Sequence, residues 1–244
     1  MKTLVLGDVH GRTIWKDIIE KENPDRVIFL GDYVSTHEGI SSDQQIEGLY
    51  AILDYKDNNP DKVILLRGNH DIQHLGFYWA ECSGLNQRVL QYMSTEVVKR
   101  WYLSLTQWIY IDEELKTIFS HAGVSTVWMD TVAKIEDIHK INDMEPSEKF
   151  GFWSNRFSDY CGESITQPPT WIRPYTLATC NVLGYDQVVG HTPQRDISKM
   201  TQNCKGKQTI WLCDSLGFGN YLVIEDGEFI PKHYEEDSQP EVLR

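Results

Sequence analysis

The chain of 244 residues predicts an α/β fold built around a parallel sheet. Three short apolar segments, residues 2–6, 26–30 and 62–66, have the composition of buried strands. Two segments with helical periodicity, residues 12–22 and 41–57, separate them, and each is followed by an Asn-Pro stop signal. Strands and helices that alternate in this way form parallel units, so the carboxyl ends of all three strands are expected at one edge of the sheet.

A polar cluster follows each of these strands directly. Residues 7–11 have the sequence Gly-Asp-Val-His-Gly, residues 31–34 Gly-Asp-Tyr-Val, and residues 67–71 Arg-Gly-Asn-His-Asp. Open α/β sheets bind ligands at this edge. A carboxylate oxygen and an imidazole nitrogen two residues apart, as in Asp8 and His10, can hold one divalent cation. The three clusters therefore predict a metal site.

The second half of the chain is expected to add further strands. Two of them run into histidine clusters, Ser-His-Ala-Gly at His121 and Gly-His-Thr-Pro at His191. The last two apolar segments are interpreted as antiparallel strands, and Asp226-Gly227 is interpreted as a hairpin turn before residues 229–230. The strands of this half are predicted at residues 108–111, 117–119, 187–189, 209–213 and 221–224.

Two longer segments are predicted to be insertions that cap the site. Residues 72–107 are irregular and rich in aromatic residues, with helices expected around 86–103. Residues 126–182 show weak helical patterning interrupted by prolines. The chain has no internal repeat and no low-complexity segment, so residues 1–244 are predicted to form a single domain.

Composition limits the classes of function. Hydrophobic residues make up 41% and charged residues 24% of the chain, which is typical of globular proteins. The formal net charge of −13 argues against binding of long nucleic acids, which requires a basic surface. A small or short anionic substrate is compatible with this charge if bound cations reverse the local field.

The cysteines and the N-terminus indicate a cytoplasmic location. No apolar run reaches the length of a membrane span, and the first apolar segment leads into Asp8 and His10 rather than into a cleavage site. The cysteines are odd in number, are scattered and form no C-x-x-C pair, which indicates free thiols. They are Cys82, Cys161, Cys180, Cys204 and Cys213.

Taken in order, the five clusters resemble the calcineurin-like metallophosphoesterases, whose pattern is GD-x-HG, GD, GNH-[ED], a later His-Ala-Gly and a final Gly-His. The resemblance spans residues 4 to about 224 and is closest to three branches: phosphoprotein phosphatases, bacteriophage-type Ser/Thr phosphatases and dinucleoside tetraphosphatases. It implies a four-layer α/β/β/α sandwich of two mixed β-sheets. It also implies a dinuclear-metal-dependent phosphatase that hydrolyses a phosphomonoester or a phosphoanhydride by means of a metal-bridging hydroxide.

The resemblance further implies two metal ions that share one carboxylate. A carboxylate has enough lone pairs to bridge two cations, whereas the side chain of Asn69 offers a neutral oxygen. Mixed oxygen and nitrogen ligands suit Mn²⁺, with Fe or Zn²⁺ as the alternatives. The implied ligands are Asp8, His10 and Asp32 for one metal, and Asp32, Asn69, His121 and His191 for the other.

Three further residues receive roles from the resemblance. His70 would protonate the leaving oxygen as a general acid, a role that suits imidazole near neutral pH. Arg67, directly before Gly-Asn-His, and Arg173, in Trp-Ile-Arg, would bind phosphate through their planar guanidinium groups.

The chain departs from the family pattern in two places. Ser35 stands where an aspartate would orient His70, so either Asp71, Glu38 or His37 replaces that aspartate or turnover is expected to be slower. Pro193 replaces the last histidine of a Gly-His-x-His motif, which leaves three protein ligands for the first metal.

Two alternative functions remain compatible with the same motifs. One is a phosphodiesterase, and the other is a non-catalytic module that binds metal and a partner. For the phosphatase, the candidate substrates are a phosphorylated protein side chain, a dinucleoside polyphosphate and a small phosphomonoester. No feature of the sequence specifies an oligomeric state.

Overall fold

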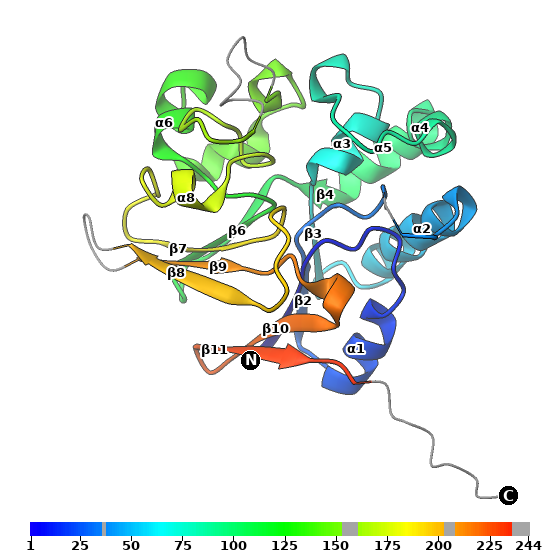
Figure 1. The fold of residues 1–244 in the computed structure, drawn as a ribbon, viewed down its shortest axis with the longest axis horizontal. Coiled ribbons are helices and arrows are strands. Elements are labelled where there is room, and N and C mark those ends of the chain that lie inside the picture. Colours follow the sequence, from blue (N-terminus) through cyan, green and yellow to red (C-terminus); the bar gives the residue numbers. More distant parts are fainter. Residues whose placement is uncertain (36–37, 153–160, 203–207, 236–244) are drawn as a thin grey trace, which may run out of the picture.

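The computed structural model describes residues 1–35, 38–152, 161–202 and 208–235, and two mixed β-sheets form its centre (Figure 1). His37 and Cys204 lie outside the described residues. Within them, no helix is both long enough and apolar enough to cross a membrane.

The first sheet has the strand order β11-β10-β1-β2-β3-β4. Strands β1 to β4 are parallel, and β10 joins β1 in antiparallel register with Leu4 opposite Val223. A hairpin turn at Asp226 and Gly227 connects β10 to β11, as predicted. The strands are β1 (Lys2–Leu6), β2 (Arg26–Phe29), β3 (Val63–Leu66), β4 (Thr106–Gln107), β10 (Asn220–Glu225) and β11 (Glu228–His233).

The second sheet has the strand order β5-β6-β7-β9-β8. Strands β6, β7 and β9 are parallel, and the hairpin partners β5 and β8 are antiparallel to β6 and β9. The strands are β5 (Ile109–Asp112), β6 (Thr117–Ser120), β7 (Asp186–Val189), β8 (Ser198–Gln202) and β9 (Gln208–Leu212).

The last two predicted strands lie in different sheets. Residues 209–213 and 221–224 were expected to be antiparallel strands. In the structure, β9 is antiparallel to β8 and parallel to β7 in one sheet, whereas β10 is antiparallel to β1 and β11 in the other. A short apolar run shows that a strand is buried but does not identify its partner. The strands β4 and β8 were not predicted.

The two sheets pack face to face through one set of alternating side chains. Val5, Ile28 and Leu66 of the first sheet share a buried cluster with Phe119 and Val188 of the second. Since successive side chains of a strand point to opposite faces, the neighbouring residues of the first sheet point to its other face.

Helices cover that other face of the first sheet. Leu4 and Phe29 pack there against Ile18 of α1 (Trp15–Glu22) and against Leu49 and Ile52 of α2 (Ser42–Asn58). Ser41 caps α2 with a reciprocal capping box to Gln44, which defines where this helix begins.

The segment between β3 and β4 forms four short helical elements. Two of them, α4 and α5, contact α2 and extend its layer (Figure 1). The elements are α3 (Asn69–His74), η1 (Tyr78–Ala80), α4 (Gln87–Met93) and α5 (Glu96–Leu105).

The outer face of the second sheet is covered by the segment between β6 and β7. Val189 and Leu212 of this sheet share a buried cluster with Ile172 and Leu177. The fold is therefore a four-layer α/β/β/α sandwich, as the resemblance implied. The helical elements here are α6 (Thr126–Trp128), η2 (Met129–Ala133), η3 (Ile138–Asp143), η4 (Glu148–Phe150) and α8 (Pro174–Leu177), and η5 (Leu216–Phe218) precedes β10.

A buried carboxylate connects α1 to the edge of the first sheet. Glu22, at the end of α1, accepts hydrogen bonds from Tyr221 at 2.8 Å and from Lys232 at 2.9 Å, and it pairs with Lys2 at 2.9 Å. Burial raises the pKa of Glu22, but the hydrogen bonds from Lys232, Lys2 and Tyr221 outweigh it and lower the pKa to about 2.

We expect Glu22→Gln to lower the free energy of unfolding by about 1–3 kcal/mol near neutral pH, because charge-assisted hydrogen bonds are lost. The folded-state pKa of Glu22 is depressed, so its stabilisation is complete above the unfolded-state pKa of about 4.3. The stabilisation then disappears as the pH falls through the folded-state value of about 2.

Urea unfolding of the natural protein and the variant across this pH range measures the difference in unfolding free energy. Glu20→Gln, at an exposed position of the same helix, is the control. An undiminished difference at the acidic end would contradict the assignment.

Candidate metal centre

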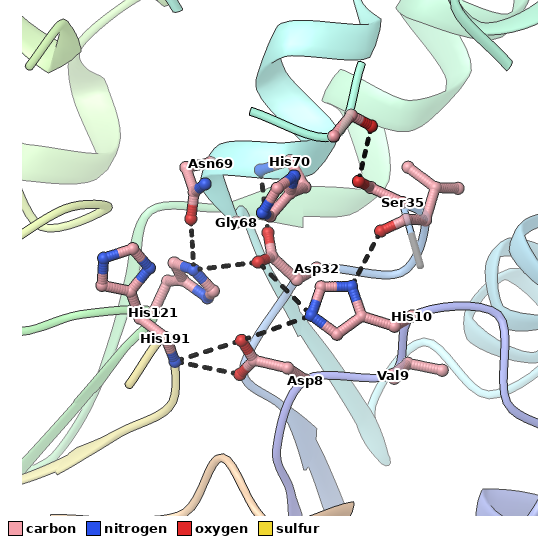
Figure 2. A network of polar contacts seen from close by, with 12 residues as sticks. Asp8, Val9, His10, Asp32, Ser35, Gly68, Asn69, His70, His121 and His191 are labelled. Atoms are coloured by element: carbon pink, nitrogen blue, oxygen red, sulfur yellow. Dashed lines mark hydrogen bonds and ion pairs between the residues drawn. The ribbon is translucent and has the colours of Figure 1, made fainter. Parts of the chain in front are cut away.

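The residues that directly follow five of the strands lie close together, as the sequence predicted. Asp8 follows β1, Asp32 follows β2, Asn69 follows β3, His121 follows β6 and His191 follows β7 (Figure 2). All of these side chains except that of His121, which is fully buried, line a cavity of about 340 Å³. The predicted residues that line it are Asp8, His10, Asp32, Asn69, His70, Arg173 and His191.

The backbone at Asp32 positions several parts of this site. Its carbonyl oxygen accepts hydrogen bonds from the N–H groups of Val9 at 3.0 Å and His10 at 2.7 Å. Its carboxylate Oδ1 accepts the N–H of His70 at 2.9 Å. Asp32 has a φ of 52°, a left-handed conformation that aspartate tolerates better than most residues. A Cβ at Gly68 would lie 2.1 Å from Asp32 Oδ1, so only glycine fits at that position.

Asp71 holds this backbone through its carboxylate. Its carboxylate accepts the N–H groups of Asp32 at 2.8 Å, Tyr33 at 2.8 Å and Gly68 at 3.1 Å. Burial raises the pKa of Asp71 to about 7, although these three N–H donors oppose the rise.

Ser35 and Glu38, which the sequence places near His70, bond to Gly84 and to Arg12. Ser35 donates its hydroxyl to the carbonyl of Gly84 at 2.8 Å. Glu38 pairs with Arg12, whose Nε donates to both carboxylate oxygens at 3.2 Å. Gln73 meets the His70 ring, with its Nε2 3.0 Å from His70 Nδ1.

Three acceptors face one another around His121. Its Nδ1 donates to the carbonyl of Leu30 at 2.8 Å, so Nε2 carries a lone pair. That lone pair faces Asn69 Oδ1 at 2.8 Å and Asp32 Oδ2 at 3.4 Å (Figure 2). Burial lowers the pKa of His121 to about 3, so protonation of His121 does not relieve the conflict near neutral pH. A cation bound between these atoms would relieve it.

The remaining predicted ligands fit the same interpretation. Among the described residues, Nε2 of His191 is buried and has no hydrogen-bond partner, which costs about 1–3 kcal/mol without a ligand. His10 lies with Nδ1 3.1 Å from the Val34 carbonyl and with Nε2 3.9 Å from Asp8 Oδ2 and 4.0 Å from Asp32 Oδ2. One ligand atom from each of Asp8, Asp32 and His121 lies within 4.8 Å of the other two. These donors fit a divalent cation.

The buried carboxylates make the cavity negative. Burial raises the pKa of Asp8 well above its usual range, and the charge of Asp214 raises it further. The pKa of Asp32 is also raised well above its usual range, chiefly by burial and then by the charge of Asp8. Burial also raises the pKa of Asp214, which lines the cavity, to about 6. Cations would compensate this charge and allow a phosphate group to approach.

Only one of the two predicted phosphate-binding arginines lines the cavity. Arg173 does so, with Nη1 donating to the His191 carbonyl at 3.2 Å and to Thr192 Oγ1 at 3.1 Å. Gly162 lies against it, because a Cβ there would be 2.9 Å from Arg173 Cγ.

The structure does not bring Arg67 to the cavity. Its Nη2 donates to the carbonyls of Leu103 at 3.1 Å and Thr106 at 2.7 Å, and its Nε donates to Thr106 Oγ1 at 3.0 Å. The guanidinium carbon lies 4.6 Å from the centre of the Trp108 ring. These contacts fasten α5 and β4 to the end of β3, so the structure does not support a phosphate-binding role for Arg67.

Three residues of the site received no role from the sequence. Arg12 lines the cavity and directly follows the Gly-Asp-Val-His-Gly motif, which was the available signal. Gln73 meets His70 from one helical turn further along α3. Asp214 lies in a Cys-Asp-Ser-Leu-Gly segment whose resemblance to the closing segment of the bacteriophage-type and dinucleoside tetraphosphatase branches was the available signal.

Comparison with known proteins agrees with this geometry. The family model described as calcineurin-like phosphoesterase matches residues 1–195. A symmetrical bis(5'-nucleosyl)-tetraphosphatase from Buchnera aphidicola is 28% identical over 144 residues, which cover 55% of this chain and 49% of that protein. The serine/threonine-protein phosphatase PP2A-like PPG1 from Saccharomyces cerevisiae is 33% identical over 153 residues, which cover 57% of this chain and 37% of that protein. The chain spans about half the length, or less, of these curated relatives.

Solved structures share the fold. A cold-active protein-tyrosine phosphatase from a psychrophilic Shewanella species aligns over 95% of this chain and 77% of its own, with a TM-score of 0.62 and 20% identity. A protein serine/threonine phosphatase from Saccharomyces cerevisiae aligns over 99% of this chain and 82% of its own, with a TM-score of 0.55 and 15% identity.

We expect Asp32→Asn to stabilise the metal-free protein and to abolish its stabilisation by Mn²⁺. The folded-state pKa of Asp32 is raised, so this carboxylate destabilises the fold as the pH rises above its unfolded-state value. Asparagine tolerates the same left-handed backbone. At about pH 8 the melting temperature of the metal-free variant should exceed that of the natural protein by about 2–6 °C.

The same thermal scans with excess Mn²⁺ complete the test. The natural protein should gain about 3 kcal/mol at a hundredfold excess over the dissociation constant, whereas the variant should gain little. Asp54→Asn, at an exposed position of α2, is the matched control and should change neither measurement. A full Mn²⁺ response in the Asp32 variant would rule out a shared ligand at this position.

Proposed function

The chain belongs to the calcineurin-like phosphoesterase family, and from its site we propose that it is a divalent-metal-dependent phosphatase acting on a phosphomonoester or a phosphoanhydride. The observation that carries the proposal is the group of facing acceptors in which His121 Nε2 lies 2.8 Å from Asn69 Oδ1 and 3.4 Å from Asp32 Oδ2. Such a cluster is costly in a folded protein unless cations occupy it.

We propose that two metal ions share Asp32. The mixture of carboxylate, amide and imidazole ligands favours Mn²⁺, with Fe or Zn²⁺ as alternatives. When bound, the ions supply Lewis acidity toward phosphoryl oxygens and lower the pKa of water. The ligands would be Asp8, His10 and Asp32 for one ion, and Asp32, Asn69, His121 and His191 for the other.

The phosphate group is then held by the chain's own cations. Arg173 is the principal candidate, because its bonds to the His191 carbonyl and to Thr192 fix the guanidinium at the cavity wall. A fixed planar fork suits two phosphate oxygens better than a flexible ammonium group does. Arg12 lines the same cavity, and Glu38 partly neutralises it.

His70 is placed to act on the leaving group. It lines the cavity, and its ring centre lies 5.5 Å from that of His10 in an edge-to-face arrangement. The role proposed for His70 is donation of a proton or a hydrogen bond to the oxygen that departs from phosphorus.

Aromatic residues that line the cavity could contact an organic group of the substrate beyond its phosphate. Trp171 and Phe218 line it, and Phe218 is 59% exposed. Aromatic side chains offer an apolar surface for a ring or an acyl chain. The curated relatives are named for dinucleoside tetraphosphates and for phosphoserine or phosphothreonine proteins, and both are candidate substrates here. The proposal retains the single domain and the cytoplasmic location expected from the sequence.

A parallel assay on metal-stripped protein reconstituted with Mn²⁺ tests the function. The substrates are p-nitrophenyl phosphate, its bis ester, a phosphopeptide and diadenosine tetraphosphate. A phosphatase should hydrolyse the monoesters or the anhydride well above the bis ester. Hydrolysis of the bis ester at a rate similar to the monoester would identify a phosphodiesterase, and no turnover with metal bound would identify a binding module.

We expect the two arginine variants to behave differently. Arg173→Ala should lower kcat/KM by about 10- to 200-fold, since a charge-assisted contact to phosphate contributes about 1.5–3 kcal/mol. Arg67→Ala should lower the free energy of unfolding by about 2–4 kcal/mol and leave the KM of the folded fraction unchanged, because its contacts are internal. Steady-state kinetics and urea unfolding of both variants measure this, with exposed Arg88→Ala as control. A higher KM in the Arg67 variant alone would assign phosphate binding to Arg67 instead of Arg173.

A further inference from the structure

A buried amide contacts the histidine that faces the phosphate site. Gln73 is 3% exposed and lies three residues after His70 on α3. Its Nε2 is 3.0 Å from His70 Nδ1. A hydrogen bond with a ring nitrogen decides which of the two nitrogens carries the proton, provided that the direction of the bond is known.

The loop at residues 82–83 fixes the direction of this bond. The backbone N–H of Cys82 donates to Gln73 Oε1 at 3.1 Å, and Gln73 Nε2 donates to the carbonyl of Ser83 at 3.1 Å. A backbone N–H can only donate and a backbone carbonyl can only accept, so the amide cannot be turned over without losing both bonds. The second hydrogen of Nε2 therefore points at His70, and Nδ1 must accept it.

We propose that Gln73 is a positioning residue that holds His70 as the tautomer with its proton on Nε2. The inference rests on the proposed function for its consequence in catalysis, but the tautomer itself does not depend on it. An orienting carboxylate, which was expected near His70, would accept a hydrogen bond from Nδ1–H and favour the opposite tautomer. Gln73 favours the tautomer with the proton on Nε2, because its amide donates a hydrogen bond to Nδ1.

The consequence concerns the leaving group. In hydrolysis, a water oxygen forms a bond to phosphorus and releases a proton to solvent as the bond from phosphorus to the leaving oxygen breaks. The Nε2–H of this tautomer can donate a hydrogen bond to the departing oxygen, whose proton then comes from solvent. Complete transfer from His70 would leave an imidazolate anion. Such a site suits leaving oxygens of low basicity, as in phosphoanhydrides and aryl phosphates, better than alkyl esters.

Nitrogen–proton correlation spectra of protein containing isotope-labelled histidine and saturated with diamagnetic Mg²⁺ test the tautomer. His70→Asn identifies the His70 signals by their loss. In the natural protein, we expect protonation at Nε2 and not at Nδ1. Protonation at Nδ1 of His70 in the natural protein would overturn the proposal, whatever the activity of the protein.

Two variants test whether Gln73 causes this preference. Gln73→Glu supplies a carboxylate, so Nδ1 of His70 should become protonated, and kcat/KM for an alkyl phosphate relative to p-nitrophenyl phosphate should rise at least tenfold. Gln73→Met removes the donor at similar volume and should leave both tautomers populated. Gln91→Glu, an exposed position of α4, makes the same chemical change and should alter neither readout. An unchanged tautomer in folded Gln73→Met would show that Gln73 does not set it.

Discussion

The site depends on one buried carboxylate that joins the ends of two strands. Asp71 accepts the N–H groups of Asp32 and Tyr33 after β2 and of Gly68 after β3. It thereby holds Asp32 in its left-handed conformation, and the carbonyl of Asp32 in turn binds the loop that carries His10. A change at Asp71 would therefore displace ligands from three strands at once.

This arrangement concentrates negative charge where water is excluded. Asp8, Asp32 and Asp71 are all nine-tenths or more buried, and burial raises the pKa of each. The free energy gained by burying the hydrophobic clusters around the two sheets offsets the cost of burying these carboxylates. Bound cations would turn the same cluster from a destabilising feature into a stabilising one.

The sequence predicted the strand ends well because each ligand follows an apolar run, and this pattern does not depend on tertiary contacts. It did not identify the partner strands of β9 and β10, because two arrangements suit the same residues. Arg67 was predictable in part. Leu65 packs toward the helices and Leu66 toward the second sheet. Strand alternation therefore places Arg67 on the helical side, where Thr106 binds it.

The surroundings of His70 could not be predicted, because they are made by a loop without a regular pattern. Residues 82–84 contact the site in three places. Asn69 donates to Cys82 Sγ, and Gln73 donates to the Ser83 carbonyl. Ser35 donates to the Gly84 carbonyl. A side-chain carbon at Gly84 would lie 2.7 Å from Ser35 Oγ and 3.4 Å from the His70 ring, and Gly84 also has a φ of 76°. The serine at position 35 thus leaves room for this loop to approach, and the loop in turn orients the amide that replaces the missing carboxylate.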